Sequence, residues 1–176
     1  MAPIDESLDF QPVRIALLTV SDSRDPSSDR SGPVLRERAE GAGHIIAAQN
    51  ILRDERAAIA QQFRQWADDP GIDVVISTGG TGVTGRDVTP EALGDVAEKS
   101  IEGFGELFRW LSYRKIGTST IQSRACAGVT NGTYIFCVPG SPSACRDVWD
   151  DILKEQLDIR HRPCNFVELL PRLREK

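Results

Sequence analysis

The sequence has 176 residues, enough for one globular domain at about 150 residues per domain. Its formal net charge of −5 argues against binding of nucleic acid over a broad surface, because such binding needs a basic face. No apolar stretch approaches the roughly 18 residues of a membrane-spanning helix, and the polar, acidic start lacks the apolar segment of a secretory signal. We therefore expect a cytoplasmic protein that associates with neither nucleic acid nor membrane.

The chain contains four cysteines, at positions 126, 137, 145 and 164, and two histidines. No pair of cysteines has the CxxC spacing of a zinc site, and so large a domain does not need a disulfide framework. Cys137 and Cys145 fall on apolar faces, where a free thiol packs as a small hydrophobic group. We expect four reduced cysteines.

Apolar runs alternate with helical patterns along the chain. After an arm over residues 1–12 that we expect to be flexible, a single domain spans residues 13–176. Within that domain, short apolar runs predict buried strands, and apolar residues at spacings of three and four predict helices. The expected strands are 14–20, 44–52, 73–77 and 133–138; the expected helices are 32–42, 54–67, one beginning at Thr89-Pro90, one including 104–111, and 144–157.

This alternation predicts an α/β fold with three layers, in which helices cover both faces of a mainly parallel sheet. Ligands bind to such sheets at the carboxyl ends of the strands. Three polar or glycine-rich loops follow expected strands at that edge: Ser21-Asp22-Ser23, the segment TGGTGVTGRDVTPEA at 78–92, and PGSP at 139–142.

The glycines of the second loop favour a site for an anion. Gly79, Gly80 and Gly82 permit a positive φ and allow backbone amides to converge on one point. Ser141 is placed to cap a helix that starts at Pro142, which directs further free amides to the same edge. The loops match neither the P-loop nor the GxGxxG pattern, and tight turns without any ligand remain an alternative.

Two aspartates accompany these loops. Asp87 lies in the second loop, and Asp54 lies at the expected start of a helix. Asp54 is open to an alternative role as a helix cap, and Asp87 to one as a surface partner of Arg86. Carboxylates beside a phosphate site are consistent with bound Mg²⁺, because bare carboxylates repel an anion. Ser123 and Arg124 can donate to a phosphate or belong to a solvated loop.

Several segments together resemble the MoaB/MogA proteins of molybdenum-cofactor biosynthesis, and the resemblance covers nearly the whole chain after residue 12. The FGELFR segment, LSYRKIGTSTIQSR and the RPCNF tail are more similar to the MoaB branch than to the MogA branch. The matching segments are TVSD (19–22), LRDE (52–55), TGGTGVTGRDVTPEA (78–92), EGFGELFRWLSYRKIGTSTIQSRA (102–125), PGSPSACR (139–146) and RPCNF (162–166).

The resemblance implies a molybdopterin-binding domain that assembles as a homotrimer or as a hexamer made of two trimers. Active relatives adenylylate molybdopterin with Mg-ATP and release pyrophosphate, before a partner protein inserts the metal. Two aspartates required in those enzymes match Asp54 and Asp87, which we also expect to bind Mg²⁺. The further residues expected to bind molybdopterin or ATP are Ser21, Asp22, Thr78, Gly79, Gly80, Thr81, Gly82, Arg86, Thr89, Glu102, Ser123, Arg124, Pro139, Gly140 and Ser141.

Two other functions are open at this point. Some MoaB-branch members lack the second aspartate and are inactive, so a protein that only binds molybdopterin is one alternative. This chain keeps Asp87 within GRDVTP, which favours catalysis. The other alternative is a nucleotide pyrophosphatase of the CinA type, whose loop resembles TGGLGPT followed by two consecutive aspartates. Here Arg86 precedes a single aspartate.

Overall fold

The computed structural model describes residues 4–175 and contains a six-stranded sheet with the strand order β2-β1-β3-β6-β5-β4. Strands β2, β1, β3 and β6 are parallel to one another, whereas β5 and β4 are antiparallel to their neighbours. The expected mainly parallel sheet is therefore confirmed. The strands are β1 (Arg14–Val20), β2 (Ile45–Leu52), β3 (Val74–Thr78), β4 (Lys99–Ser100), β5 (Cys126–Thr130) and β6 (Thr133–Val138).

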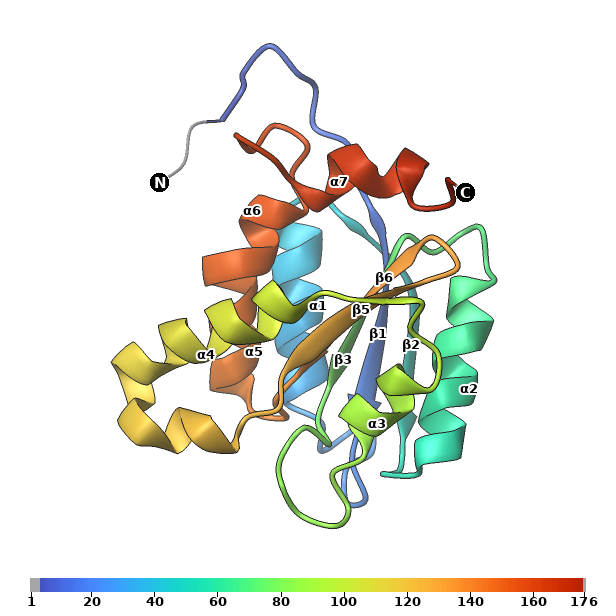
Figure 1. Cartoon of the computed structure of the whole chain (residues 1–176), viewed down its shortest axis with the longest axis vertical. Coiled ribbons are helices and arrows are strands. Elements are labelled where there is room, and N and C mark those ends of the chain that lie inside the picture. Colours follow the sequence, from blue (N-terminus) through green and yellow to red (C-terminus); the bar gives the residue numbers. More distant parts are fainter. Residues whose placement is uncertain (1–3, 176) are drawn as a thin grey trace.

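Helices cover both faces of the sheet, which confirms the three-layer α/β fold (Figure 1). One face is covered by α1 (Ser31–Gly41), α4 (Glu102–Ile116) and α5 (Pro142–Val148), and the other by α2 (Arg56–Ala67) and α3 (Thr89–Gly94). No helix within residues 4–175 is long and apolar enough to cross a membrane. The shorter elements are η1 (Gly117–Gln122), η2 (Trp149–Leu153), α6 (Lys154–Gln156), α7 (Phe166–Leu169) and η3 (Leu170–Arg172).

The two helical layers make two cores, because alternate residues of each central strand point to opposite faces. Leu17 of β1 and Ile76 of β3 pack beneath α1 and α5, together with Trp149. Leu18 and Val75, their neighbours in sequence, pack with the residues of α2 and α3. A strand buried on both faces reads as a continuous apolar run, which is why these strands were predictable.

The helix expected over 144–157 is divided into three segments. α5 ends at Val148, a π-helical segment covers Trp149–Leu153, and α6 follows. In an α-helix, residues four apart drift by about 40° per turn, since a turn holds about 3.6 residues. A wider π turn offsets this drift, so that Val148, Trp149 and Leu153 all stay buried against the sheet.

The hairpin formed by β5 and β6 differs from the prediction, which left residues 117–132 without a strand. Asn131 and Gly132 form its two-residue turn, with φ angles of 44° and 77°. Both residues of this kind of hairpin turn need a positive φ, and Asn-Gly is the dipeptide that best provides it. The signal for β5 was therefore present in the sequence and was missed.

The first three residues of the expected N-terminal arm lie outside the described residues. Within residues 4–12, Ile4 forms an isolated β-bridge with His161, and the Asp5 amide donates to the Arg160 carbonyl at 2.8 Å. Phe10 packs against His44, with their ring centroids 5.2 Å apart. These contacts, with the C-terminal segment, lie at the end of the sheet away from the loops that follow β1, β3 and β6 (Figure 1).

Candidate active site

The loops that follow β1, β3 and β6 meet through their backbones. The Gly79 amide donates to the carbonyl of Val138 at 3.0 Å, which ties the second loop to the end of β6. Gly79 has a φ of +105°, and a Cβ atom there would lie 2.1 Å from the carbonyl oxygen of Val20. Only glycine fits this position, because a side chain would collide with the backbone of the neighbouring strand.

Two buried threonines hold these loops in place. Thr89 donates its hydroxyl to the Gly79 carbonyl at 2.9 Å, and its own amide donates to Gly80 at 3.0 Å. Thr78 donates its hydroxyl to the carbonyl of Pro139 at 3.0 Å. Neither threonine lines the cavity described next, and their hydroxyls bind the loops themselves. The structure therefore places Thr78 and Thr89 behind the cavity wall, where they hold the loops that form it.

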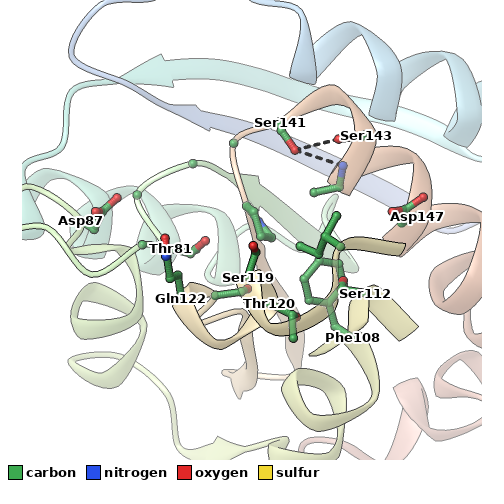
Figure 2. Close-up of a pocket in the computed structure, with 18 of the residues that line it drawn as sticks. Thr81, Asp87, Phe108, Ser112, Ser119, Thr120, Gln122, Ser141, Ser143 and Asp147 are labelled. Atoms are coloured by element: carbon green, nitrogen blue, oxygen red, sulfur yellow. Dashed lines mark hydrogen bonds between the residues drawn. The ribbon is translucent and has the colours of Figure 1, made fainter. Parts of the chain in front are cut away.

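A cavity of about 530 Å³ opens beside the loops, and it collects residues from distant parts of the chain (Figure 2). Its volume lies within the range of about 300–1,000 Å³ that is common for small-molecule sites. The expected site residues that line it are Ser21, Asp54, Gly79, Gly80, Thr81, Gly82, Arg86, Asp87, Ser123, Pro139, Gly140 and Ser141. Ser141 also caps α5, accepting from the Ala144 amide at 3.2 Å, as the sequence predicts.

Asp54 follows β2 and faces the loop glycines. The alternative role of Asp54 as a helix cap is wrong, since α2 begins at Arg56 and no side chain caps it. A Cβ atom on Gly80 would lie 2.8 Å from Oδ1 of Asp54, so this carboxylate stands directly beside the glycine backbone. Burial raises the pKa of Asp54, as do the nearby carboxylates of Asp22 and Asp87, and Arg86 offsets only part of this effect.

Asp87 is held by its own loop. Its Oδ2 accepts hydrogen bonds from the amide and the hydroxyl of Thr84, at 2.8 and 2.6 Å. Burial acts to raise the pKa of Asp87, but the hydrogen bonds from Thr84 outweigh it and keep the pKa below its ordinary value. Asp87 does not pair with Arg86, as its alternative role required, because that guanidinium bonds Asp22 at 2.9 Å and Glu55 at 3.0 Å.

These two carboxylates fit a magnesium ion that also binds a ligand's phosphates. No group of three or more His, Cys, Asp or Glu side chains among residues 4–175 is arranged to hold a metal by itself. Mg²⁺ is commonly bound by one or two carboxylates together with substrate phosphates and waters. Asp54 and Asp87 supply that number. Burial, and after it the carboxylates of Asp22 and Asp87, raise the pKa of Asp54, and a bound cation would offset both effects.

The remaining expected residues lie at the rim or outside the cavity. Asp22 pairs with Arg86 at the rim. Arg124 donates to the carbonyls of Gly82 and Asp87, at 2.6 and 2.7 Å, and pairs with Glu91, so it braces the loop from outside. The prediction that Glu102 belongs to this site is wrong, because Glu102 begins α4 and lines a second, smaller cavity.

The far wall of the cavity was not predicted as part of the site. It is built by α4, η1 and α5, and includes the ring of Phe108 and the ion pair between Lys115 and Asp147, whose charged atoms are 2.7 Å apart. In Figure 2, Asp87 and Asp147 lie on opposite sides of the pocket. The hydroxyl-rich run GTSTIQS, at 117–123, is the one sequence signal that marked this wall. The unpredicted lining residues are Val20, Phe108, Ser112, Lys115, Ile116, Ser119, Thr120, Gln122, Ser143, Ala144 and Asp147.

Comparison with known proteins places the chain among molybdopterin-related proteins. Residues 16–159 match the family model described as "Probable molybdopterin binding domain". The chain is 51% identical over 160 residues to molybdenum cofactor biosynthesis protein B of Escherichia coli K12, covering 91% of this chain and 94% of that protein.

Solved structures that resemble this fold come from the same group of proteins. A crystal structure of a molybdenum cofactor biosynthesis protein B has a TM-score of 0.84 at 34% identity, covering 94% of this chain and 98% of its own. The tungsten cofactor synthesizing protein MoaB from Pyrococcus furiosus has a TM-score of 0.76 at 29% identity, covering 94% and 99% of the two chains.

Proposed function

The chain belongs to the molybdopterin-binding domain family, and from this premise we propose that it acts in molybdenum-cofactor biosynthesis by adenylylating molybdopterin with Mg-ATP. The observation that carries the proposal is that Asp54 and Asp87 line one cavity with the glycine backbone of residues 79–82. Backbone amides suit phosphates, and two carboxylates suit the magnesium that accompanies a nucleotide. A metal-inserting protein would receive the product.

The reaction needs no general base from the protein. An oxygen of the terminal phosphate of molybdopterin, already anionic at neutral pH, attacks the α-phosphorus of ATP. The bond from that phosphorus to the bridging oxygen of pyrophosphate breaks, and pyrophosphate leaves with the electron pair. The cavity accordingly contains no histidine, since neither His44 nor His161 lines it. Catalysis then rests on holding the two phosphates in line and on balancing their charge.

Each group at the loop end has a place in this scheme. The loop at Gly79, Gly80 and Gly82 lines the cavity, and a side chain at any of these positions would collide with Val20, with Thr89 and Asp54, or with Asp87. Glycine therefore keeps this backbone and the two carboxylates in place around the proposed phosphate site. Asp54 and Asp87 would hold Mg²⁺, which neutralises the charge that develops on the phosphates. Arg86 lies at the same end, where Asp22 and Glu55 hold its guanidinium and balance its charge.

One assay tests the proposal and separates it from the two alternatives. Purified protein is incubated with molybdopterin and Mg-ATP, and adenylylated pterin and pyrophosphate are measured with and without EDTA. We expect both products in equal amounts, and only when Mg²⁺ is present. Molybdopterin binding without any ATP-dependent product would instead support a protein that only binds the pterin. Hydrolysis of ADP-ribose would support a pyrophosphatase of the CinA type.

Gly80→Ala is expected to weaken Mg-ATP binding about tenfold, or about 1.4 kcal/mol, and to leave molybdopterin binding nearly unchanged. The added Cβ would lie 2.4 Å from the Thr89 hydroxyl and 2.8 Å from the Asp54 carboxylate, at a φ of +64°. It would therefore displace Asp54, which is proposed to hold the metal. Calorimetric titration with each ligand measures both affinities.

Gly94→Ala is the matched control, since nothing lies within 4 Å of a Cβ atom at that position. It is expected to bind both ligands as the parent protein does. Equal losses of affinity for ATP and molybdopterin in a folded Gly80→Ala protein would mean that the metal and the nucleotide do not sit at Gly80.

The protein is also proposed to form a trimer, or a hexamer of two trimers, through the outer face of α4. Of the aromatic and leucine residues in this helix, Phe104 and Phe108 are buried within the subunit and Leu111 packs on the core. Leu107 remains 42% exposed, Trp110 56% and Tyr113 57%. Large apolar side chains gathered on one face are typical of a subunit contact.

Light scattering of the parent protein at micromolar concentration is expected to give a trimer or a hexamer. Trp110→Asp should shift the mass to that of a monomer, because a charge would be buried in the contact. Ile45→Asp, at an exposed position on the edge strand β2, is the matched control and should leave the assembly intact. A monomeric parent protein would rule out this association.

A further inference from the structure

Two cysteines lie directly opposite each other on neighbouring strands, away from the candidate active site. In the β5–β6 hairpin, Cys126 and Cys137 are register partners. Directly opposed residues of antiparallel strands have Cα atoms about 4.5–5.5 Å apart, and disulfides usually span about 4.4–6.8 Å. The Cα separation of such a pair therefore falls within the range that a disulfide spans, and the Cβ atoms, about 4.5–5.5 Å apart in such pairs, must approach to about 3.5–4.5 Å. Cys145 and Cys164 have no such register partner.

The two thiols already interact, and their environments differ. Interaction with the Cys137 thiol lowers the pKa of Cys126 and outweighs burial, which raises it, and the nearby guanidinium of Arg124 lowers it further. Burial raises the pKa of Cys137 well above its ordinary value. Cys126 is thus the sulfur that is more readily deprotonated, and Cys137 is a protonated neighbour within reach of it.

The surroundings of the two cysteines include a cavity that reaches Cys126 and a buried hydroxyl, that of Ser77, next to Cys137. Cys126 is partly exposed and lines the second cavity, of about 180 Å³, between α3, α4 and β5. That volume admits a small oxidant but not a large one. On the other side, Ser77 of β3 is the register partner of Cys137, and its hydroxyl is buried without a hydrogen-bond partner in the described part of the chain. Ser77, Cys137 and Cys126 thus form a row across three strands.

We propose that Cys126 and Cys137 are a reversible oxidation site, at which a small peroxide converts the two thiols into a cross-strand disulfide. The thiolate of Cys126 attacks one oxygen of hydrogen peroxide, the O–O bond breaks, and a sulfenic acid and hydroxide form. The sulfur of Cys137 then attacks the sulfur of Cys126, the S–O bond breaks, and the proton of the Cys137 thiol leaves with the hydroxyl group as water. Two thiols and one peroxide give one disulfide and two waters.

All four cysteines are free thiols in the structure, as the sequence predicts, and the proposal adds that two of them act as a pair. A sulfur that reacts first, beside a second sulfur that resolves the product, is the usual arrangement of a cysteine that senses oxidants. The exposed Cys164 has no second cysteine opposite it. The buried Cys145 is hydrogen-bonded to Thr78, with its sulfur 3.2 Å from the threonine hydroxyl oxygen. The proposal is independent of adenylylation, because it involves neither ATP nor molybdopterin.

The test uses the full-length Cys164→Ser protein, which removes the exposed thiol that would otherwise react first. After treatment with hydrogen peroxide, free thiols are alkylated and the protein is digested without reductant for mass spectrometry. We expect peptides that contain Cys126 and Cys137 to be joined, with Cys145 alkylated, and dithiothreitol to restore both thiols. Oxidation of Cys126 to sulfinic acid while Cys137 stays free, or no loss of either thiol, would overturn the proposal.

Two variants in the same background separate the steps. Cys137→Ala lacks the resolving sulfur, so Cys126 should accumulate as a sulfenic acid that dimedone labels. Cys126→Ser should leave Cys137 reduced at the same peroxide concentration, since the first attack is lost. Labelling of Cys137 in that variant would contradict the assigned order of the two sulfurs. The Cys164→Ser protein carries no substitution in the core, so the disulfide test with that protein remains valid even if Cys137→Ala folds poorly.

Discussion

Asp87→Asn is expected to slow the formation of adenylylated molybdopterin at least about a hundredfold, equivalent to about 2.7 kcal/mol of activation free energy. Asparagine keeps the shape of the side chain and can still accept the hydrogen bonds from Thr84, so the loop should keep its conformation. What is lost is one negative charge beside the proposed magnesium. Molybdopterin binding should remain, because an anionic ligand gains nothing from a carboxylate.

The rate is measured as pyrophosphate released per minute, and molybdopterin affinity is measured separately by titration. Asp95→Asn is the matched control, since Asp95 pairs with Arg56 at the surface and does not line the cavity. It should turn over like the parent protein. An Asp87→Asn protein that also works at the parent rate would remove Asp87 from the reaction.

Asp54→Asn is expected to reduce the rate by a similar factor while leaving the fold as stable as the parent, or more so, at neutral pH. The reason is the raised pKa of Asp54, which shows that its charge is unfavourable in the folded protein. A folded pKa above the ordinary value of 3.8 means that the parent loses stability as the pH rises through the folded pKa. Asparagine never acquires this charge and escapes the loss.

Urea denaturation between pH 3 and pH 8 measures this difference. The free energies of unfolding of parent and variant should be closest at the acid end, and the variant should gain relative to the parent as the pH rises. A variant that is less stable than the parent at neutral pH would mean that Asp54 stabilises the fold, as a helix cap would do. If Asp54→Asn loses activity and gains free energy of unfolding, the Asp54 carboxylate serves the reaction at a cost to stability.

The part of the fold that the sequence predicts best is the part that is buried on both faces. The runs at 14–20 and 73–77 become β1 and β3, because only a central strand needs apolar residues on both sides. The strand β5 is hard to predict because most of its residues, among them Ala127 and Gly128, are small, and Val129 is its one large apolar residue. Its evidence lay in the Asn131-Gly132 turn rather than in hydrophobicity.

The candidate site likewise has one part that the sequence predicts and one part that it does not. Glycines 79, 80 and 82 and the caps of PGSP have local causes, so the loops could be located from the residues themselves. The far wall with Phe108, Lys115 and Asp147 depends on how α4 packs beside α5, which no local pattern encodes. Arg124 was expected to bind a phosphate, but its partners Gly82 and Glu91 lie far from it in sequence and could not be foreseen.

The backbone contact between the loops after β3 and β6, in which the Gly79 amide donates to Val138, fixes the course of both loops before any ligand arrives. Little chain entropy is then lost on binding, so more of the interaction energy appears as affinity. The same contact makes the loops one mechanical unit, since a Cβ on Gly140 would lie 3.1 Å from the Cα of Gly79. Substitutions at Gly79 and Gly140 should therefore be non-additive: once the first has separated the loops, the second has little left to disturb.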